Sequence, residues 1–304
     1  MGWLQLTHNR GRLGAALSGV SFATILVFAQ LGVLGALNAS IVMPYERIDA
    51  DVMISAADAN TLTEGSHAPR QWMFQALSAR GVAEAAALYV GAIEWSLGDG
   101  STATLQLLAL EPSQAHFFKG DLARAAKATA QADAALIDVS TRGVDLGDLA
   151  GLSPDAPVET EMNGRTIELI GSFSIGSGFS ADGYSIVSDQ TFLRLFPKRS
   201  AGAPNHLLLK TDPDADVADV VARIKALLPP DYARVRTLEA AKEEDRAYQT
   251  TERPTGVIFG FGVVIGVLVG VVIVYQVLAT DVADHLAEYA TFKAIGYPHR
   301  FFLG

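Results

Sequence analysis

Two stretches without a charged side chain, residues 13–37 and 255–279, constrain this chain more than any other feature. About 20 apolar residues in a helix cross the roughly 30 Å hydrocarbon core of a bilayer, and both stretches reach that length. A cleaved signal peptide is the alternative for the first, but its apolar region is too long and "GALNAS" is a poor cleavage site. A buried core helix is the alternative for the second, but the gap between Arg253 and Asp281 is too long for one. The sequence therefore predicts a membrane protein with two transmembrane helices.

The charged residues beside these stretches predict which ends lie inside the cell. Arg10 and Arg12 precede the first stretch with no acidic residue before them, and Lys293 and Arg300 follow the second. Basic residues close to the ends of a span favour the cytoplasm. Residues 1–12 are therefore expected in the cytoplasm, and residues 38–254 on the opposite side of the membrane.

The charge balance excludes some partners for the segment 38–254. Of the 23 basic residues two precede it and two follow it, and three of the 33 acidic residues follow it, which leaves 19 basic against 30 acidic residues and a net charge of −11. Such an acidic surface repels phosphate backbones, so nucleic acid is not an expected partner. The chain has no cysteine, which excludes disulfides and thiolate metal sites.

The segment 38–254 alternates short strand patterns with helix patterns. "DADVMIS" (residues 49–55) places Val52 and Ile54 on one face of a strand. "VETEMNGRTIELIG" is typical of a hairpin, because Asn163-Gly164 suits a type I′ turn. Further strands are predicted at residues 86–97, 103–110, 135–139, 184–187 and 206–210. This mixture indicates a large α+β domain in two lobes.

Two helices are predicted in the same segment. "DPDADVADVVARIKALLPP" carries an apolar stripe at helical spacing, with Asp212 as the expected cap and Pro229 as the end. "TLEAAKEEDRAYQTTE" (residues 237–252) predicts a polar helix that continues the second span outward as a stalk. Residues 57–70 and 140–157 are rich in turn-forming residues and are predicted loops.

The sequence offers little for catalysis, and the chain is not expected to be an enzyme. It contains no G-x-x-x-x-G-K-[ST] motif, so it lacks a Walker-type phosphate cradle. The glycine-rich segment 173–183 follows a strand pattern, but no amphipathic helix follows it, which favours a loop over an anion site. No H-E-x-x-H pair occurs, and the histidines are expected at the surface: His8, His67, His116, His206, His285 and His299.

Glycines in the second apolar stretch recur every four residues. Gly262, Gly266 and Gly270 form one such series, and Gly256 and Gly260 form another. Four-residue spacing aligns glycines on one helix face, where another backbone is able to approach closely. The alternative is that glycine is simply common in membrane helices. We predict a helix-packing face at Gly262, Gly266 and Gly270, with either the first span or a second subunit as its partner.

Residues 280–296 carry a separate helix pattern directly after the second span. Thr280 or Asp281 is the expected cap, and Gly296 suits the left-handed position that ends a helix. The helix is acidic, whereas a membrane-surface helix is usually basic. We therefore expect its apolar side to fill a groove on another protein, with a solvated juxtamembrane helix as the alternative. That apolar side holds Val282, Leu286, Tyr289 and Phe292.

Three segments resemble a known family of membrane proteins. "WLQLTHNRGRLGAALSGVSFATILVFAQLG", "DADVMIS" and "YQVLATDVADHLAEYATFKAIGY" are similar to DevC-type ABC exporter permeases of the MacB/FtsX-like permease superfamily. The resemblance extends over nearly the whole chain. It implies a MacB-like periplasmic domain between the first two of four spans, and a cytoplasmic coupling helix at residues 280–296. It also implies that residues 297–304 begin a third span, and that the chain is truncated before spans three and four.

The resemblance further implies partners, a mechanism and docking residues. A separate ABC ATPase would bind ATP, so no cofactor is expected on this chain. A membrane-fusion (HlyD-like) adaptor and an outer-membrane channel would complete an exporter in the bacterial inner membrane, with a homodimer of this chain at its centre. Closure of the ATPase would move the coupling helix and, through it, the periplasmic domain, a mechanism called mechanotransmission. The cargo would be lipid or glycolipid. The ATPase-docking residues would be Asp281, Asp284, His285, Leu286, Glu288, Tyr289, Lys293 and Gly296.

Two other functions fit the same topology. A two-span receptor would sense a ligand with its periplasmic domain and signal through its tail. A permease-like regulator would control a cell-wall hydrolase without moving cargo. A receptor tail should continue as a long heptad-bearing helix, whereas Gly296 and Pro298 end this one. Neighbouring genes for an ATPase and an adaptor would favour export.

Overall fold

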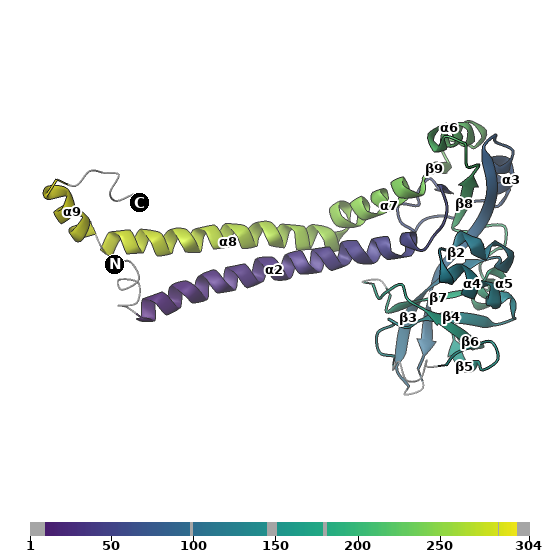
Figure 1. The fold of residues 1–304 in the computed structure, drawn as a ribbon, viewed down its shortest axis with the longest axis horizontal. Coiled ribbons are helices and arrows are strands. Elements are labelled where there is room, and N and C mark those ends of the chain that lie inside the picture. The colour runs from purple at the N-terminus through teal and green to yellow at the C-terminus, as the bar shows by residue number, and fades with distance from the viewer. Residues whose placement is uncertain (1–9, 98–99, 145–150, 179–180, 285, 297–304) are drawn as a thin grey trace. The chain divides into compact units, whose positions relative to one another are not determined.

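A computed structural model describes residues 10–97, 100–144, 151–178, 181–284 and 286–296 (Figure 1). The chain divides into two compact units. One, the helical unit, comprises Met1–Gly35 and Pro254–Gly304. The other, the domain, comprises Ala36–Arg253. Each unit is built by different packing, so each is described by itself.

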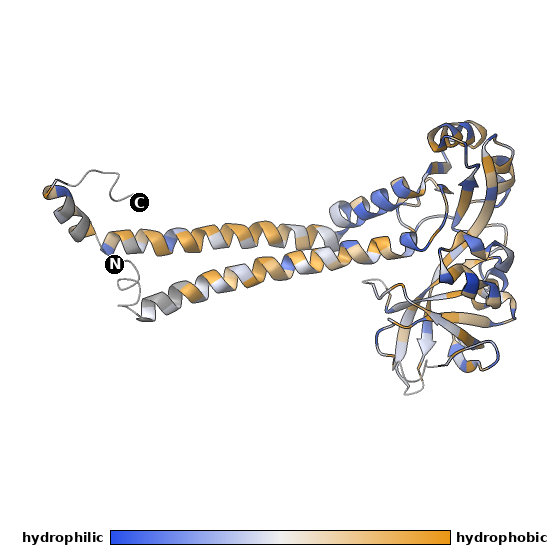
Figure 2. Ribbon diagram, viewed as in Figure 1, coloured by the Kyte–Doolittle hydropathy of each residue, from blue (hydrophilic) through white to orange (hydrophobic). Residues whose placement is uncertain are grey.

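The helical unit contains α8 (Pro254–Asp284), α9 (Leu286–Ala294) and most of α2 (Arg10–Glu46), whose last turns belong to the domain. By length and composition α2 and α8 could each cross a membrane. They correspond to the two apolar stretches of the sequence. Figure 2 shows that apolar residues cover α8 for most of its length.

The expected helix start at Thr280 or Asp281 is wrong. α8 continues without a break to Asp284. The hydroxyl of Thr280 donates to the carbonyl oxygen of Gln276, 2.7 Å away, which is the bond of a threonine inside a helix. A capping side chain would instead accept a bond from a backbone N–H further along the chain. The apolar helix therefore passes directly into its acidic end.

The domain is built on a mixed sheet of nine strands among the described residues. The strand order is β3-β7-β4-β6-β5-β2-β8-β1-β9, with β3 also paired to β2. The strands are β1 (Val52–Ala56), β2 (Val82–Ser96), β3 (Thr102–Leu110), β4 (Ala134–Asp138), β5 (Val158–Met162), β6 (Arg165–Phe173), β7 (Gly183–Ser188), β8 (His206–Thr211) and β9 (Ala233–Thr237). The predicted α+β domain is confirmed, and β9 is a strand that the sequence patterns do not predict.

The long strand β2 connects two parts of this sheet. Its first half pairs with β8, which continues through β1 to β9. Its second half pairs with β3 on one side and briefly with β5 on the other. Because β3, β7, β4, β6 and β5 are neighbours in that order, the second half of β2 closes a ring of strands. A closed ring leaves no free edge in that part of the sheet.

The predicted hairpin is confirmed. β5 and β6 are antiparallel, with Met162 opposite Arg165, so only two residues form the turn. Asn163 has φ 52° and Gly164 has φ 71°. Positive φ at both central positions defines the type I′ turn, whose twist matches that of the flanking strands.

Helices cover both faces of the sheet and create two cores. In β1, Val52 and Ile54 belong to one core, whereas Met53 belongs to the other. The first core contains residues of α3 (Gln71–Leu77), α5 (Asp189–Leu195) and α6 (Val217–Leu227). The second contains residues of the end of α2, η1 (Pro112–Phe117), α4 (Asp121–Ala126) and α7 (Leu238–Ala247). A short 3-10 segment, η2 (Lys127–Ala130), follows α4.

The expected cap of α6 at Asp212 is wrong. The helix begins at Val217, and the side chain of Asp216 accepts from the N–H groups of Ala218 and Asp219. Asp212 begins a turn, because its carbonyl oxygen accepts from the N–H of Ala215 at 2.9 Å. Both aspartates have a side chain that is able to cap a helix. Because a turn follows Asp212, the helix begins later and Asp216 is its cap.

The polar helix expected near residues 237–252 consists of two pieces. α7 is capped by Thr237, and a π-helical turn, η3 (Tyr248–Glu252), follows it. Arg253 is extended, with φ −74° and ψ 138°, as expected for a residue before a proline. The predicted polar helix is therefore present, but the extended backbone of Arg253 interrupts the helical conformation before α8 begins.

Candidate functional site: an apolar helix pair and a C-terminal helix

The large apolar side chains of the helical unit point outward. Phe28 and Ile25 of α2 are 69% and 67% exposed, and Phe261 of α8 is 65% exposed. The hydroxyls of Ser18 and Thr24 donate to the carbonyl oxygens of Gly14 and Val20 within α2. An apolar exterior with internally bonded hydroxyls is what a helix in lipid requires.

Glycines and other small residues lie where α2 and α8 face each other. A Cβ atom built on Gly266 would lie 2.9 Å from Cγ2 of Val27, and one on Gly262 would lie 2.8 Å from Cδ of Gln30. A Cβ atom on Gly270 would lie 3.6 Å from the Cβ of Ala23. These pairs run in opposite directions along the two helices, so the contact is antiparallel. Gly260, by contrast, would meet nothing within 4 Å.

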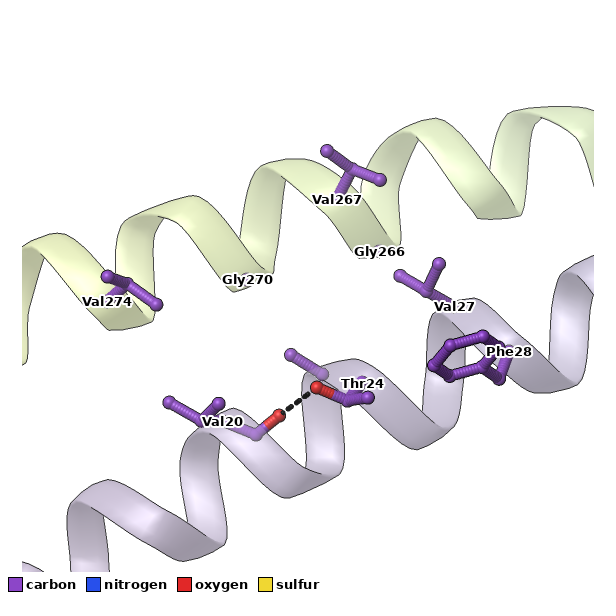
Figure 3. Close-up of a pocket in the computed structure, with 9 residues that line it drawn as sticks. Val20, Thr24, Val27, Phe28, Gly266, Val267, Gly270 and Val274 are labelled. Atoms are coloured by element: carbon purple, nitrogen blue, oxygen red, sulfur yellow. Dashed lines mark hydrogen bonds between the residues drawn. The ribbon is translucent and has the colours of Figure 1, made fainter.

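An apolar groove runs along one side of this helix pair (Figure 3). It has a cavity volume of about 230 Å³. Gly266 and Gly270 form part of its wall from α8, and Thr24 lies on the α2 side with its hydroxyl already bonded to Val20. The complete lining is Val20, Ala23, Thr24, Val27, Phe28, Gly266, Val267, Gly270 and Val274.

The predicted docking residues whose backbone the structure describes lie in the last turn of α8, in α9 and just after it. Leu286, at the start of α9, is 58% exposed, and Ile295, just after it, is 70% exposed. Asp284 and Lys293 are exposed as well. Gly296 has φ 100°, and its N–H donates to the carbonyl oxygen of Lys293. His285 lies outside the described residues, as do the side chains of Asp281, Glu288 and Tyr289.

A buried polar network in the domain connects segments distant in sequence. Asp245 of α7 accepts from the Tyr45 hydroxyl at the end of α2, 2.9 Å away, and from the N–H of Leu62 at 2.8 Å. His206 of β8 bonds through Nε2 to the carbonyl oxygen of Leu62 and through Nδ1 to the hydroxyl of Ser55, both at 2.8 Å. The network therefore ties the last turn of α2 to α7 and to the sheet.

Burial perturbs both titratable groups of this network. Desolvation raises the pKa of Asp245 above its usual value, although its hydrogen-bond donors oppose the change. Desolvation lowers the pKa of His206 to about 4, since the charged ring would be buried near Arg236. His206 is therefore neutral at physiological pH.

The expectation that His206 is a surface residue is wrong, because it is 1% exposed. Ser55 is also fully buried, so the Ser55–His206 pair has no access to a substrate. Within the described residues no group of three or more histidine, cysteine or acidic side chains is placed to hold a metal ion. The network connects parts of the domain. Its members carry no local sequence signal, because residues such as Tyr45 and Asp245 lie 200 positions apart.

No protein family matches the sequence, and no curated protein is similar to it. Among solved structures, the extracellular domain of the noncanonic ABC-type transporter YknZ from Gram-positive bacteria is similar with a TM-score of 0.44 and 11% identity, over 62% of this chain and 98% of that chain. The periplasmic region of MacB from Actinobacillus actinomycetemcomitans is similar with a TM-score of 0.46 and 10% identity, over 65% of this chain and 93% of that chain.

Proposed function

We propose that this chain is a permease subunit of an ATP-driven exporter that works by mechanotransmission. The observation that carries the proposal is the sequence of parts along the chain. An apolar helix leads into the domain, a second apolar helix follows the domain, and a short exposed helix, α9, comes directly after it. The sequence resemblance to exporter permeases supports the same order of parts.

α2 and α8 are proposed to span the bacterial inner membrane, with the domain in the periplasm and both flanking segments in the cytoplasm. Their outward-facing apolar side chains support this placement, since lipid is the solvent in which such a surface is stable. Reporter fusions test the topology. Fusions after Gly2 and Gly304 should report the cytoplasm, and a fusion at Asp148 should report the periplasm. A periplasmic signal at either end would contradict the placement.

α9 is proposed to be the coupling helix that docks on a separate ABC ATPase. Leu286 at the start of α9 and Ile295 just after it are both exposed, and a pocket on a partner would remove them from water. Tyr289 is the expected anchor, because large aromatic residues dominate interface energetics. The acidic rim, Asp281, Asp284 and Glu288, would steer association with a basic surface.

Motion of α9 is proposed to reach the domain through the two long helices. Inside the domain, the Tyr45–Asp245 bond joins the last turn of α2 to α7, so a displacement of either helix acts on the other. The domain would then act on a membrane-fusion adaptor and an outer-membrane channel, with two copies of this chain per exporter. Lipid or glycolipid is the proposed cargo, and ATP is hydrolysed on the partner subunit.

Co-purification with the ATPase tests the docking role. The ATPase is expressed with this chain, and the chain carries Leu286→Ala together with Tyr289→Ala. Loss of two anchors should weaken docking by about thirtyfold or more, on the order of 2 kcal/mol. Phe261→Ala, which removes an exposed aromatic side chain from the first third of α8, is the matched control and should retain the ATPase. Equal retention by the double variant and the control would mean that α9 is a solvated connector.

The two alternative functions receive less support. A receptor that signals through a heptad helix needs a long helix after its second span, whereas α9 ends at Ala294 and Gly296 follows with positive φ. A regulator of a cell-wall hydrolase would share the docking helix, so it differs from an exporter only in what the domain contacts. Co-purification of an adaptor with the domain would distinguish them.

A further inference from the structure

A second cavity lies in the domain, independent of the helix pair and of the proposed transport function. It has a cavity volume of about 330 Å³ and lies between the end of α6, strand β9 and α7. Its lining residues are Lys225, Leu228, Pro230, Ala233, Arg234, Val235, Arg236 and Glu244. Four of them are consecutive residues of β9, so the cavity follows the backbone of that strand.

β9 is the last strand in the sheet order, and the register shows which of its backbone groups are free of the sheet. Leu238 donates to the carbonyl oxygen of Asp51, and Ala57 donates to that of Tyr232. In an antiparallel pair these bonds recur at every second residue, so Arg234 and Arg236 turn their backbone groups toward β1. The N–H and C=O of Val235 then face away from β1, toward the open edge.

Three of the four charged side chains that line this cavity are basic. Arg236 is the only arginine among the buried residues that the structure describes, and its Nε has no hydrogen-bond partner there. Its NH1 donates to Oε2 of Glu244, and Nε of Arg234 lies 3.6 Å from the same oxygen. Lys225 is exposed at the rim. NH2 of Arg236 also donates to the carbonyl oxygen of Ala59, and NH1 of Arg234 donates to Oδ1 of Asn60. Two arginines therefore contact one carboxylate, and Lys225 adds a third positive charge to the lining.

We propose that this cavity binds the phosphate group of a phosphate monoester. Lys225, Arg234 and Arg236 against Glu244 leave a local charge of about +2, which matches the charge of about −1.5 to −2 on a monoester at pH 7. Arginine presents paired N–H donors that suit phosphate oxygens. The site is a basic pocket in a segment whose net charge is −11, so it is a local exception to an acidic surface rather than part of a broad basic patch. The ligand is either a soluble monoester or a lipid whose headgroup ends in a phosphate.

Calorimetry on the full chain in uncharged detergent tests the site, with glycerol 3-phosphate as the soluble probe. Lys225→Ala should lower the affinity by roughly tenfold, because it removes one charge-assisted contact. Glu244→Gln should raise the affinity, since it removes the carboxylate that competes for the arginines while keeping the size of the side chain. Lys127→Ala, which removes an exposed lysine that does not line the cavity, is the matched control and should bind as the unaltered chain does.

A second arm identifies the source of the phosphate. The full chain in nanodiscs is titrated with phosphatidic acid, and a response that Lys225→Ala weakens while glycerol 3-phosphate gives none assigns the site to a lipid headgroup. A response to glycerol 3-phosphate assigns it to a soluble ligand. The proposal is overturned if neither probe binds, or if the Lys225 and Glu244 variants bind as the control does, in which case the basic cluster serves only the packing of β9 against α7.

Discussion

The domain and the helical unit place their large apolar side chains in opposite ways. Among the described residues of the domain only five large apolar side chains are exposed: Phe74, Leu77, Val158, Leu227 and Tyr232. The helical unit exposes all the others, along α2, α8 and α9. The domain therefore removes most of its large apolar side chains from solvent, whereas the helical unit leaves most of its own exposed.

The two units consequently use different contacts to hold their helices. In the domain, large side chains such as Tyr89 and Phe192 interdigitate, with ring centroids 5.6 Å apart. In the helical unit, the contact between α2 and α8 is made at Gly262, Gly266 and Gly270. Where lipid already solvates large apolar groups, burying them gains little, and close backbone approach becomes the main source of packing energy.

The sharpest test of this difference truncates one phenylalanine in each unit. Phe192→Ala in the domain should cost about 3–5 kcal/mol of unfolding free energy, because Phe192 is fully buried and its loss leaves a cavity. Phe261→Ala in α8 should change that free energy far less, since Phe261 is 65% exposed. Denaturation in detergent, followed by the fluorescence of buried Trp72 and Trp95, measures both. Equal losses would contradict the opposite burial of the two units.

We expect the stability of the domain to depend on pH, because two of its buried groups have shifted pKa values. The pKa of His206 is lowered from 6.5 to about 4 in the folded domain. Between these two values, the unfolded chain protonates the ring and the folded domain keeps it neutral. The stabilising contribution is therefore present above pH 6.5 and is lost as the pH falls toward 4, by about 3 kcal/mol. Asp245 acts in the opposite direction, because its raised pKa favours folding at lower pH. His206→Gln should flatten the acid loss in denaturation curves, and an unchanged slope would exclude His206 as its origin.

The helix pair should be sensitive to added bulk rather than to lost bulk. Gly266→Leu should separate α2 from α8 and cost about 1–3 kcal/mol, because a Cβ atom there already lies 2.9 Å from Val27. Gly260→Leu on the same helix is the matched control, since nothing lies within 4 Å of that position.

A disulfide reports the separation directly, because the natural chain has no cysteine. Ala23→Cys with Gly270→Cys should form a bridge, since the two Cβ positions are 3.6 Å apart and a disulfide needs about 3.8 Å. Gly266→Leu should reduce bridge formation, and Gly260→Leu should not. Equal bridging in both variants would make the three glycines incidental to packing.

The features that the sequence predicted depend on short-range chemistry. Asn163-Gly164 determines its turn locally, and alternating apolar residues mark β1 without reference to the rest of the chain. The sequence does not predict β9, because "ARVRT" places arginine on alternate positions. One of these, Arg236, is buried and donates to Glu244 and to the carbonyl oxygen of Ala59. Burial of a charged side chain depends on its partners, which a local pattern does not contain.

In the candidate site, too, some features follow from the local sequence and others depend on the tertiary fold. Four-residue spacing identifies a glycine face, but whether α2 or another subunit opposes it depends on the tertiary fold. The caps at Thr280 and Asp212 were misassigned because their side chains have capping chemistry whether or not a helix begins there. The Tyr45–Asp245 contact joins residues 200 positions apart, and neither residue is unusual in its own segment.

The smallest expected effect concerns the end of α9, where a Cβ atom built on Gly296 would meet nothing within 4 Å among the described residues. Gly296 has φ 100°, a conformation that residues with a Cβ rarely adopt, so Gly296→Ala should cost about 1 kcal/mol locally. A nine-residue helix is marginal by itself, so even this cost should fray its last turn. Hydrogen exchange of the Ile295 amide, which donates to Thr291, should accelerate roughly fivefold, whereas exchange of amides in the core strands of the domain should not change. Gly296→Asn should cost less than alanine, because asparagine tolerates positive φ better. If alanine and asparagine leave exchange of Ile295 equally slow, the end of α9 is held by contacts other than its own backbone, and a docked partner becomes the first place to look for them.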